Sequence, residues 1–301
     1  MDYKEFMNAI LEEVKITAGE EYDVRLQEIT KNNGVIREGI VLVEKGYNLA
    51  PAISLERYYE LYKSGIGIGE LARKVMEENR SIPVNRKVPD EIFTDFERLK
   101  GRILYRYINY DRNALMLKEV PHLRTLDLAM VFYYHPEIDD PTDSTVLIRS
   151  RDLKEWNISL HDLWELAQKN TPELEPPSIL PIRSLISELA DCRDDERANE
   201  VVFNENEEMP MYVLTNKDRT FGAACLSYQN IFSDISDRFQ SSLFILPSSI
   251  HEVIILPDSG KFSKKDLEKM VTEINECEVA PYEVLSNHVY HYSRETKELA
   301  L

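Results

Sequence analysis

The longest uninterrupted apolar run in the chain extends only from Leu128 to Tyr134. A helix that spans a membrane needs about 20 consecutive apolar residues, so this run predicts a buried strand instead. The N-terminal residues Met1 to Phe6 carry a charge every few positions and lack the basic segment and apolar core of a secretory signal. The sequence therefore predicts a chain that is not inserted in a membrane and that is located in the cytoplasm.

The balance of charged residues limits the classes of partner. The chain has 301 residues, with 36 Lys and Arg against 54 Asp and Glu, and a formal net charge of -18 at pH 7. Nucleic acids and anionic lipids are bound mainly through Lys and Arg, so neither is an expected partner. An acidic mimic of nucleic acid would need its charge concentrated on one face. We expect an unidentified protein or small molecule as the partner, and the oligomeric state stays open.

Cysteine spacing and glycine patterns argue against a cofactor or a bound metal. Cys192, Cys225 and Cys277 are odd in number and form no C-x-x-C pair, so neither a disulfide framework nor a cysteine zinc site is indicated. The glycines between Gly65 and Gly69 precede a helical pattern, but no Gly-Lys-Ser/Thr follows, as a phosphate-binding loop would require. The sequence predicts reduced thiols, no cofactor and no metal.

Residues 1–181 are predicted to form a helix-rich α+β domain with β-hairpins. Apolar residues at helical spacing predict an N-terminal helix that ends at Gly19, and Asn32-Asn33-Gly34 predicts the turn of a hairpin. Pro89 is suited to the first turn of a helix whose apolar spacing continues to Tyr107. The run that ends at Tyr134 predicts one strand of a second hairpin.

A helix and an acidic linker are predicted over residues 182–208. Residues 172–181 contain four prolines, and residues 173–208 hold 3 basic and 11 acidic residues, a net charge of 3 − 11 = −8. Such a composition disfavours a packed core, so we expect the domain boundary here.

Residues 209–301 are predicted to form a second, smaller α/β sandwich-like domain with the element order ββαββαβ. Hydrophobic patterns give the expected strands as 211–215, 220–226, 243–247, 250–256 and 284–292, with helices over 228–239 and 263–276. Two hairpins that alternate with helices fit an α+β fold.

Four phrases of the sequence resemble, in the same order, a family of uncharacterised proteins from anaerobic Firmicutes. They are APAISLERYYELYKSG, VPHLRTLDLAMVFYY, MYVLTNKDRTFGAACL and FILPSSIHEVIILP. The resemblance covers nearly the whole chain. It implies membership of a domain family of unknown function and brings no activity or catalytic residue with it.

The segment between the expected strands 243–247 and 250–256 is the predicted binding surface. Ser248, Ser249, His251 and Glu252 place two hydroxyls, an imidazole and a carboxylate in one tight turn between apolar strands. Polar side chains on a rigid hairpin are suited to binding. Serine side chains can also satisfy the backbone of the turn itself, and this alternative stays open.

Other polar groups give weaker hypotheses. Cys225 with His251 could form a nucleophilic pair, although a thiol beside alanines is more often inert core. His288 and His291 would point to opposite faces of a strand and could not share a metal. A larger set of His and acidic side chains matches no metal motif and is expected to be a solvated loop: His122, Asp127, His135, Glu137, Asp139, Asp140 and Asp143.

The sequence contains no constellation that identifies a reaction, so whether the protein is an enzyme stays undecided. We interpret it as a non-enzymatic cytoplasmic protein that binds or interacts with a partner. The alternative is a hydrolase or transferase whose catalytic residues are dispersed near the Ser248–Glu252 hairpin.

Overall fold

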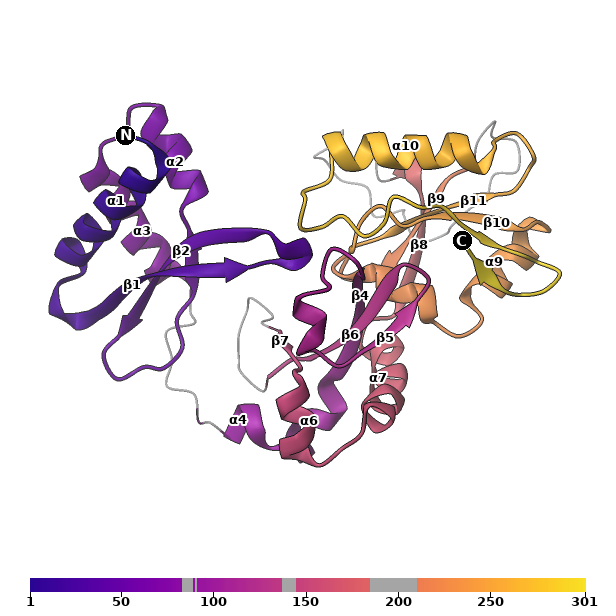
Figure 1. Cartoon of the computed structure of the whole chain (residues 1–301), viewed down its shortest axis with the longest axis horizontal. Helices are drawn as coiled ribbons and strands as arrows, with labels where there is room; N and C mark the ends of the chain where they lie inside the picture. Colours follow the sequence, from indigo (N-terminus) through magenta and orange to yellow (C-terminus); the bar gives the residue numbers. More distant parts are fainter. Residues whose placement is uncertain (83–88, 90, 137–144, 185–209) are drawn as a thin grey trace. The chain divides into compact units, whose positions relative to one another are not determined.

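The structure is a computed structural model that describes residues 1–82, 89, 91–136, 145–184 and 210–301. It has an α+β fold with antiparallel sheets, as predicted (Figure 1). The chain divides into two compact units. Unit 1 comprises Met1–Leu99 with His135–Thr145, and unit 2 comprises Lys100–Tyr134 with Val146–Leu301. Among the described helices, none combines the length and the apolar character needed to cross a bilayer.

Unit 1 begins with the predicted helix, α1 (Tyr3–Ala18). Asp2 caps it: the Asp2 carboxylate accepts the Glu5 N–H at 2.8 Å, and the Glu5 carboxylate accepts the Asp2 N–H at 3.0 Å. This reciprocal pair satisfies two N–H groups that have no partner within the helix. The helix ends at Gly19, whose φ of 65° is a conformation that glycine adopts without strain. The apolar face of the helix is fully buried at Phe6, Ile10 and Val14.

A three-stranded sheet and two more helices complete the described core of unit 1. The sheet order is β1-β2-β3, and the predicted hairpin joins β1 to β2 through Asn32–Gly34. α1 packs against the third helix, and both contribute apolar side chains to one core with the sheet. The remaining elements are β1 (Tyr22–Thr30), β2 (Ile36–Glu44), β3 (Ala52–Ser54), α2 (Glu56–Lys63), α3 (Ile68–Ser81), α4 (Glu91–Thr94) and α5 (Phe96–Leu99).

Unit 2 contains a four-stranded sheet with the order β4-β6-β5, and β7 pairs with β6. The strands are β4 (Ile103–Asn109), β5 (His122–Thr125), β6 (Leu128–Tyr134) and β7 (Val146–Leu147). The predicted strand that ends at Tyr134 is therefore confirmed. The helix predicted from Pro89 to Tyr107 is wrong beyond Leu99, because the segment from Ile103 is the strand β4.

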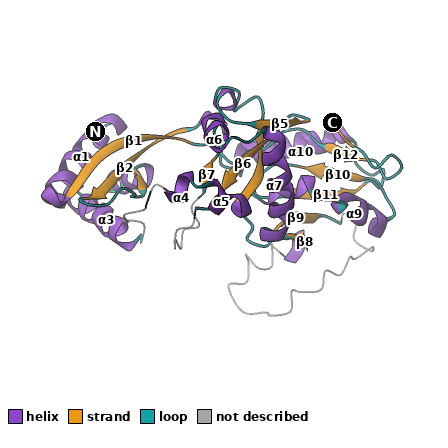
Figure 2. Ribbon diagram, turned by 90° about the horizontal axis from the view of Figure 1, so that it is seen from below, coloured by secondary structure: helices purple, strands orange, loops and turns teal. Residues whose placement is uncertain are grey.

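Two helices follow the sheet, α6 (Ser150–Trp156) and α7 (Leu160–Leu174). α7 lies along β4, and Figure 2 shows the helix beside the four-stranded sheet. Its buried Thr171 Oγ1 accepts the Tyr105 N–H at 3.1 Å, and its Asn170 Nδ2 donates to the Ile103 carbonyl at 3.0 Å. Polar side chains of the helix thus satisfy backbone groups of a strand that pairs with a neighbour on one side only.

A six-stranded sheet forms the rest of unit 2, with the order β13-β12-β10-β11-β9-β8. Helix α10 packs on it, because Leu267 and Val271 share a core with Phe244 and Leu246. The elements are β8 (Pro177–Pro181), β9 (Tyr212–Asn216), α9 (Ile231–Phe239), β10 (Leu243–Leu246), β11 (Val253–Pro257), α10 (Lys264–Cys277), β12 (Tyr290–Tyr292) and β13 (Leu299–Ala300).

The predicted order of elements in residues 209–301 needs two corrections. The expected strand 220–226 is a 3-10 helical segment, Gly222–Ser227, whose small side chains pack in the core. The expected strand 284–292 is reduced to β12, and the residues before it form a loop that is fixed by side-chain contacts. Both expected helices are confirmed, as α9 and α10.

The compact units also differ from the expected domains. β8 precedes the expected linker 182–208 and β9 follows it, yet the two pair in register from Pro177 with Asn216 to Pro181 with Tyr212. Both sides of the linker therefore belong to one sheet. β8 is an edge strand of this sheet. An edge strand pairs on one side only and needs fewer backbone N–H donors, so it tolerates the prolines that suggest a boundary. Residues 185–208 of the linker lie outside the described residues.

Candidate functional site

The predicted binding residues Ser248 and Ser249 are buried, with 7% and 5% of their surface exposed. The Leu285 N–H donates to the Ser248 carbonyl at 2.9 Å, and Ser249 forms a backbone bridge with Val284. The Ser249 Oγ accepts the His251 N–H at 3.0 Å, which is the local bond expected of a serine in a turn. These two serines therefore hold the segment that joins β10 to β11 against the loop before β12.

His251 contacts Phe221, which lies in the same segment as Cys225. Its ring stacks on Phe221, with centroids 5.5 Å apart and an interplanar angle of 25°. Its Nδ1 accepts the Phe221 N–H at 3.2 Å, so the proton of the neutral ring is on Nε2. That nitrogen faces Glu283, whose Oε1 is 3.7 Å away. His251 is thus held by Phe221 and Glu283.

Glu252 is the fourth predicted binding residue. Burial raises its pKa above the ordinary value, although the charge of His251 and a hydrogen bond with Ser249 act in the opposite direction. The structure thus brings Ser249, His251 and Glu252 together as predicted neighbours of one turn. Ser248 is directed to backbone contacts instead.

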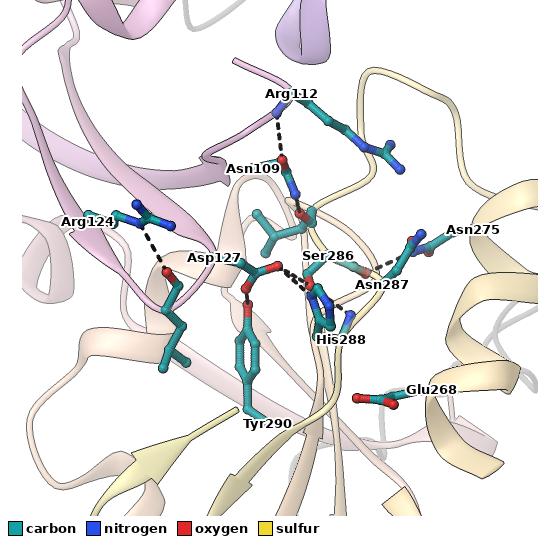
Figure 3. A network of polar contacts seen from close by, with 12 residues as sticks. Asn109, Arg112, Arg124, Asp127, Glu268, Asn275, Ser286, Asn287, His288 and Tyr290 are labelled. Carbon is teal, nitrogen blue, oxygen red and sulfur yellow. Dashed lines mark hydrogen bonds and ion pairs between the residues drawn. The ribbon is translucent and has the colours of Figure 1, made fainter. Parts of the chain in front are cut away.

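A second polar cluster centres on Asp127, in the turn between β5 and β6 (Figure 3). The Asp127 carboxylate accepts hydrogen bonds from the Tyr290 hydroxyl and from the Ser286 Oγ, the latter at 2.7 Å, and the His288 Nδ1 is 3.1 Å from it. Burial alone would raise the pKa of Asp127. The hydrogen bonds from Tyr290, Ser286 and His288 outweigh burial and hold the pKa below its ordinary value. Asp127 is therefore an anchored carboxylate, ionised at neutral pH.

His288 is the exposed member of this cluster, with 58% of its side chain accessible against 15% for Asp127. Its Nδ1 lies against the Asp127 carboxylate, which accepts only, so Nδ1 carries the proton. Its backbone N–H also donates to the Ser286 Oγ at 2.9 Å. In the described structure Nε2 has no hydrogen-bond partner, so it is the ring nitrogen available to another molecule.

Asparagines on both sides fix the loop that carries His288 (Figure 3). Asn109 at the end of β4 donates from Nδ2 to the Leu285 carbonyl at 2.9 Å. Asn275 of α10 donates from Nδ2 to the Ser286 carbonyl at 2.9 Å and to the Asn287 Oδ1 at 2.8 Å. The loop is therefore held in place by both the four-stranded sheet and the helix that covers the other sheet.

Sequence reasoning placed these residues in other groups. The sequence pattern groups Asp127 with an expected solvated loop and pairs His288 only with His291. In the structure His291 pairs with Asp258 instead, with Nε2 and Oδ2 3.2 Å apart. Within the described residues, no group of three His, Cys, Asp or Glu is arranged to hold a metal ion. Glu137, Asp139, Asp140 and Asp143 of the acidic loop lie outside those residues.

Comparison with known proteins identifies a family but no individual relative. No curated protein and no solved structure matches the chain. The model of a family of unknown function, DUF5688, matches residues 3–294 and thus nearly the whole sequence. The chain therefore belongs to the DUF5688 family of unknown function.

Proposed function

We propose that the protein is a non-enzymatic cytoplasmic binding protein and that His288 is a contact residue for its ligand, a small molecule or a protein segment. One observation carries this proposal. An exposed imidazole is held in a fixed direction by a carboxylate that is itself anchored by Tyr290 and Ser286.

The energetic argument concerns side-chain freedom. Binding usually costs about 0.5–1.5 kcal/mol for each flexible side chain that it immobilises. The Asp127 contact restricts the His288 ring before any ligand arrives, and the asparagine contacts restrict its loop. A polar group that is exposed and already oriented loses little further entropy on binding. Such a group is well suited to contact a ligand.

A hydrolase or transferase is the second candidate, and the orientation of the same ring favours it. A histidine that donates from Nδ1 to a carboxylate presents Nε2 as a base, which is the arrangement used in general acid–base catalysis. Asp127 and His288 are 161 positions apart, so this reading matches an enzyme whose residues are dispersed in the sequence.

Ligand-observed NMR against a library of soluble metabolites and short peptides tests the proposal. We expect at least one compound that binds the wild type and binds His288→Gln about tenfold or more weakly, because a lost hydrogen bond to a charged group costs about 1.5–3 kcal/mol. Asp127→Asn should weaken the same compound, since it removes the anchor of the ring.

His161→Gln is the matched control. His161 is also an exposed histidine beside a carboxylate, because its Nε2 is 3.5 Å from Glu165 Oε1 on α7. Unlike Asp127, Glu165 is itself exposed to solvent. Its replacement should leave binding unchanged. Compounds that bind wild type and His288→Gln equally would contradict the proposal. Conversion of a compound by wild type but not by His288→Gln would favour the enzyme.

A further inference from the structure

We propose that Arg106 forms a second binding site in unit 2, and that this site takes the carboxylate group of a molecule with an apolar or aromatic body. The residues of the Arg106 site differ from those of the cluster around His288. The Arg106 site is independent of the function proposed above.

Arg106 projects from β4 against two aromatic rings. Its guanidinium carbon is 4.4 Å from the centroid of the Phe221 ring and 5.2 Å from that of the Tyr133 ring. Its Nε is buried and has no hydrogen-bond acceptor, while the residue as a whole is partly exposed. In the part of the chain that the structure describes, no carboxylate lies within ion-pair distance of this guanidinium. The rings contact the guanidinium carbon, and the Nε–H donor stays without an acceptor.

The two ring contacts do not offset the cost of placing this charge. A cation–π contact recovers only part of the free energy that is lost when an ion is removed from water. Burial accordingly lowers the pKa of Arg106. An uncompensated cation at a partly exposed position is stabilised by an anion that enters from solvent.

Glu175 is the carboxylate whose charge acts on Arg106, but its oxygens accept hydrogen bonds from other residues. Its Oε1 accepts the Tyr133 hydroxyl at 2.7 Å, and its Oε2 accepts the Asn216 Nδ2 at 3.1 Å. The charge of Glu175 raises the pKa of Arg106, against the larger effect of burial, so the two groups interact over a longer range. The hydrogen bonds fix Glu175 on neutral donors and leave the Arg106 donors for an external group.

The surroundings favour a carboxylate over a phosphate. A guanidinium whose carbon contacts ring faces presents its donors at its edge, which matches the two oxygens of a planar carboxylate. His251 stacks on the same Phe221 ring, and its Nε2 faces Glu283 at 3.7 Å. Because Arg106 is a single cation on which the charge of Glu175 already acts, a ligand group with one negative charge is favoured over a group with two. The Phe221 ring, which is partly exposed, offers apolar surface to the rest of the ligand, whereas the Tyr133 ring is buried beneath the guanidinium.

The test is an NMR titration of the full chain labelled with 15N-arginine. The probes are sodium benzoate, N-acetylphenylalanine and its amide, and inorganic phosphate, all at constant ionic strength. We expect the Arg106 Nε–Hε signal, assigned by its absence from Arg106→Lys, to shift saturably with both carboxylates. The amide should bind at least about tenfold more weakly than the acid, because only the acid carries the carboxylate.

The two carboxylates distinguish the natural source of the group. Tighter binding of N-acetylphenylalanine than of benzoate assigns the site to the C-terminus of a polypeptide, and the reverse order assigns it to a small organic acid. The titrations themselves use the wild-type protein, and Arg106→Lys serves only to assign the Arg106 signal.

Arg124 provides the internal control. Its guanidinium carbon lies 4.2 Å from the Tyr110 ring, but the residue is exposed and its Nε donates to the Leu126 carbonyl. Its signal should not move. An Arg106 signal that stays fixed, moves equally with acid and amide, or moves more with phosphate would overturn the proposal and leave Arg106 as a structural link between Tyr133 and Phe221.

Discussion

Gly222 lies so close to Thr215 that the Thr215 Oγ1 occupies the space in which a side chain on Gly222 would begin. The His251 carbonyl oxygen is 2.5 Å from the same point. This close approach is next to Phe221, which adopts a left-handed φ of 55° and whose ring contacts both Arg106 and His251. Because residue 222 has no side chain, the backbone can approach Thr215 and His251 this closely. This approach positions the Phe221 ring, which contacts both Arg106 and His251.

Gly222→Ala is therefore expected to destabilise the protein. The added methyl group would meet backbone atoms of His251 and Asn216, which cannot move as freely as the end of a side chain. Overpacking of this kind costs about 1–3 kcal/mol. Urea unfolding measures the change. Gly101→Ala is the control, since nothing lies within 4 Å of the position of its added methyl group. Equal stability of the two variants would contradict the expected packing.

Asp127→Asn should reduce stability in a manner that depends on pH. The folded pKa of Asp127 lies below its ordinary value of 3.8, so its contribution is complete above that value and is lost as the pH falls through the folded pKa. We expect wild type to exceed the variant by about 1.5–3 kcal/mol at pH 7 and by less at pH 3. Urea unfolding at both pH values measures the difference. A difference that is independent of pH would argue against an anchored, ionised carboxylate.

Helices with a clear polar face were predictable from the sequence, whereas segments buried on both faces were not. In α1 the apolar residues recur at helical spacing, and the Asp2 cap fixes its start. Ile103 and Tyr107 also have helical spacing, but they lie in β4, where nearly every residue is apolar and buried. In such a run a period of four residues carries no information, because any spacing can be found in it. The apolar and β-branched content of the run was the better indicator.

The candidate site was only partly predictable, because its contacts connect distant parts of the chain. The turn that holds His251 and Glu252 was recognisable from a local concentration of polar residues. Nothing local in the sequence links Asp127 to His288 or Arg106 to Phe221, since these pairs depend on how the two sheets of unit 2 pack. One signal was present: Arg106 is a single cation within an apolar strand.

Cys225 is expected to be unreactive in the folded protein. Burial raises the pKa of its thiol to about 12, and its Sγ lies 3.2 Å from the Thr215 carbonyl. Thiolate is the reactive form, so little is present at pH 8. In a Cys192→Ser background, Ellman's reagent should modify the exposed Cys277 rapidly and Cys225 only after unfolding by guanidinium. Rapid modification of both thiols in native buffer would revive the nucleophile hypothesis.

Limited proteolysis should cut the chain within residues 185–208, where the sequence is acidic and has few aromatic residues. Although the peptide bond is broken, we expect the two fragments to stay associated, because β8 from one pairs with β9 from the other. The Tyr228 hydroxyl also donates to the Glu175 carbonyl across the cut at 2.7 Å. Size-exclusion chromatography after cleavage should therefore give one peak that contains both fragments.

The same experiment distinguishes the two divisions of the chain. Independent domains on either side of 182–208 would separate after the cut and elute as two species. A sheet that includes both β8 and β9 holds the fragments together until urea unfolds it. The two fragments of the nicked protein should then unfold and separate in one transition. Tyr228→Phe serves as a graded variant: it removes one hydrogen bond, worth about 0.5–1.5 kcal/mol, and should lower the urea concentration at which the fragments separate. Separation of the wild-type fragments in native buffer would contradict the pairing of β8 with β9 and restore the boundary expected from the prolines.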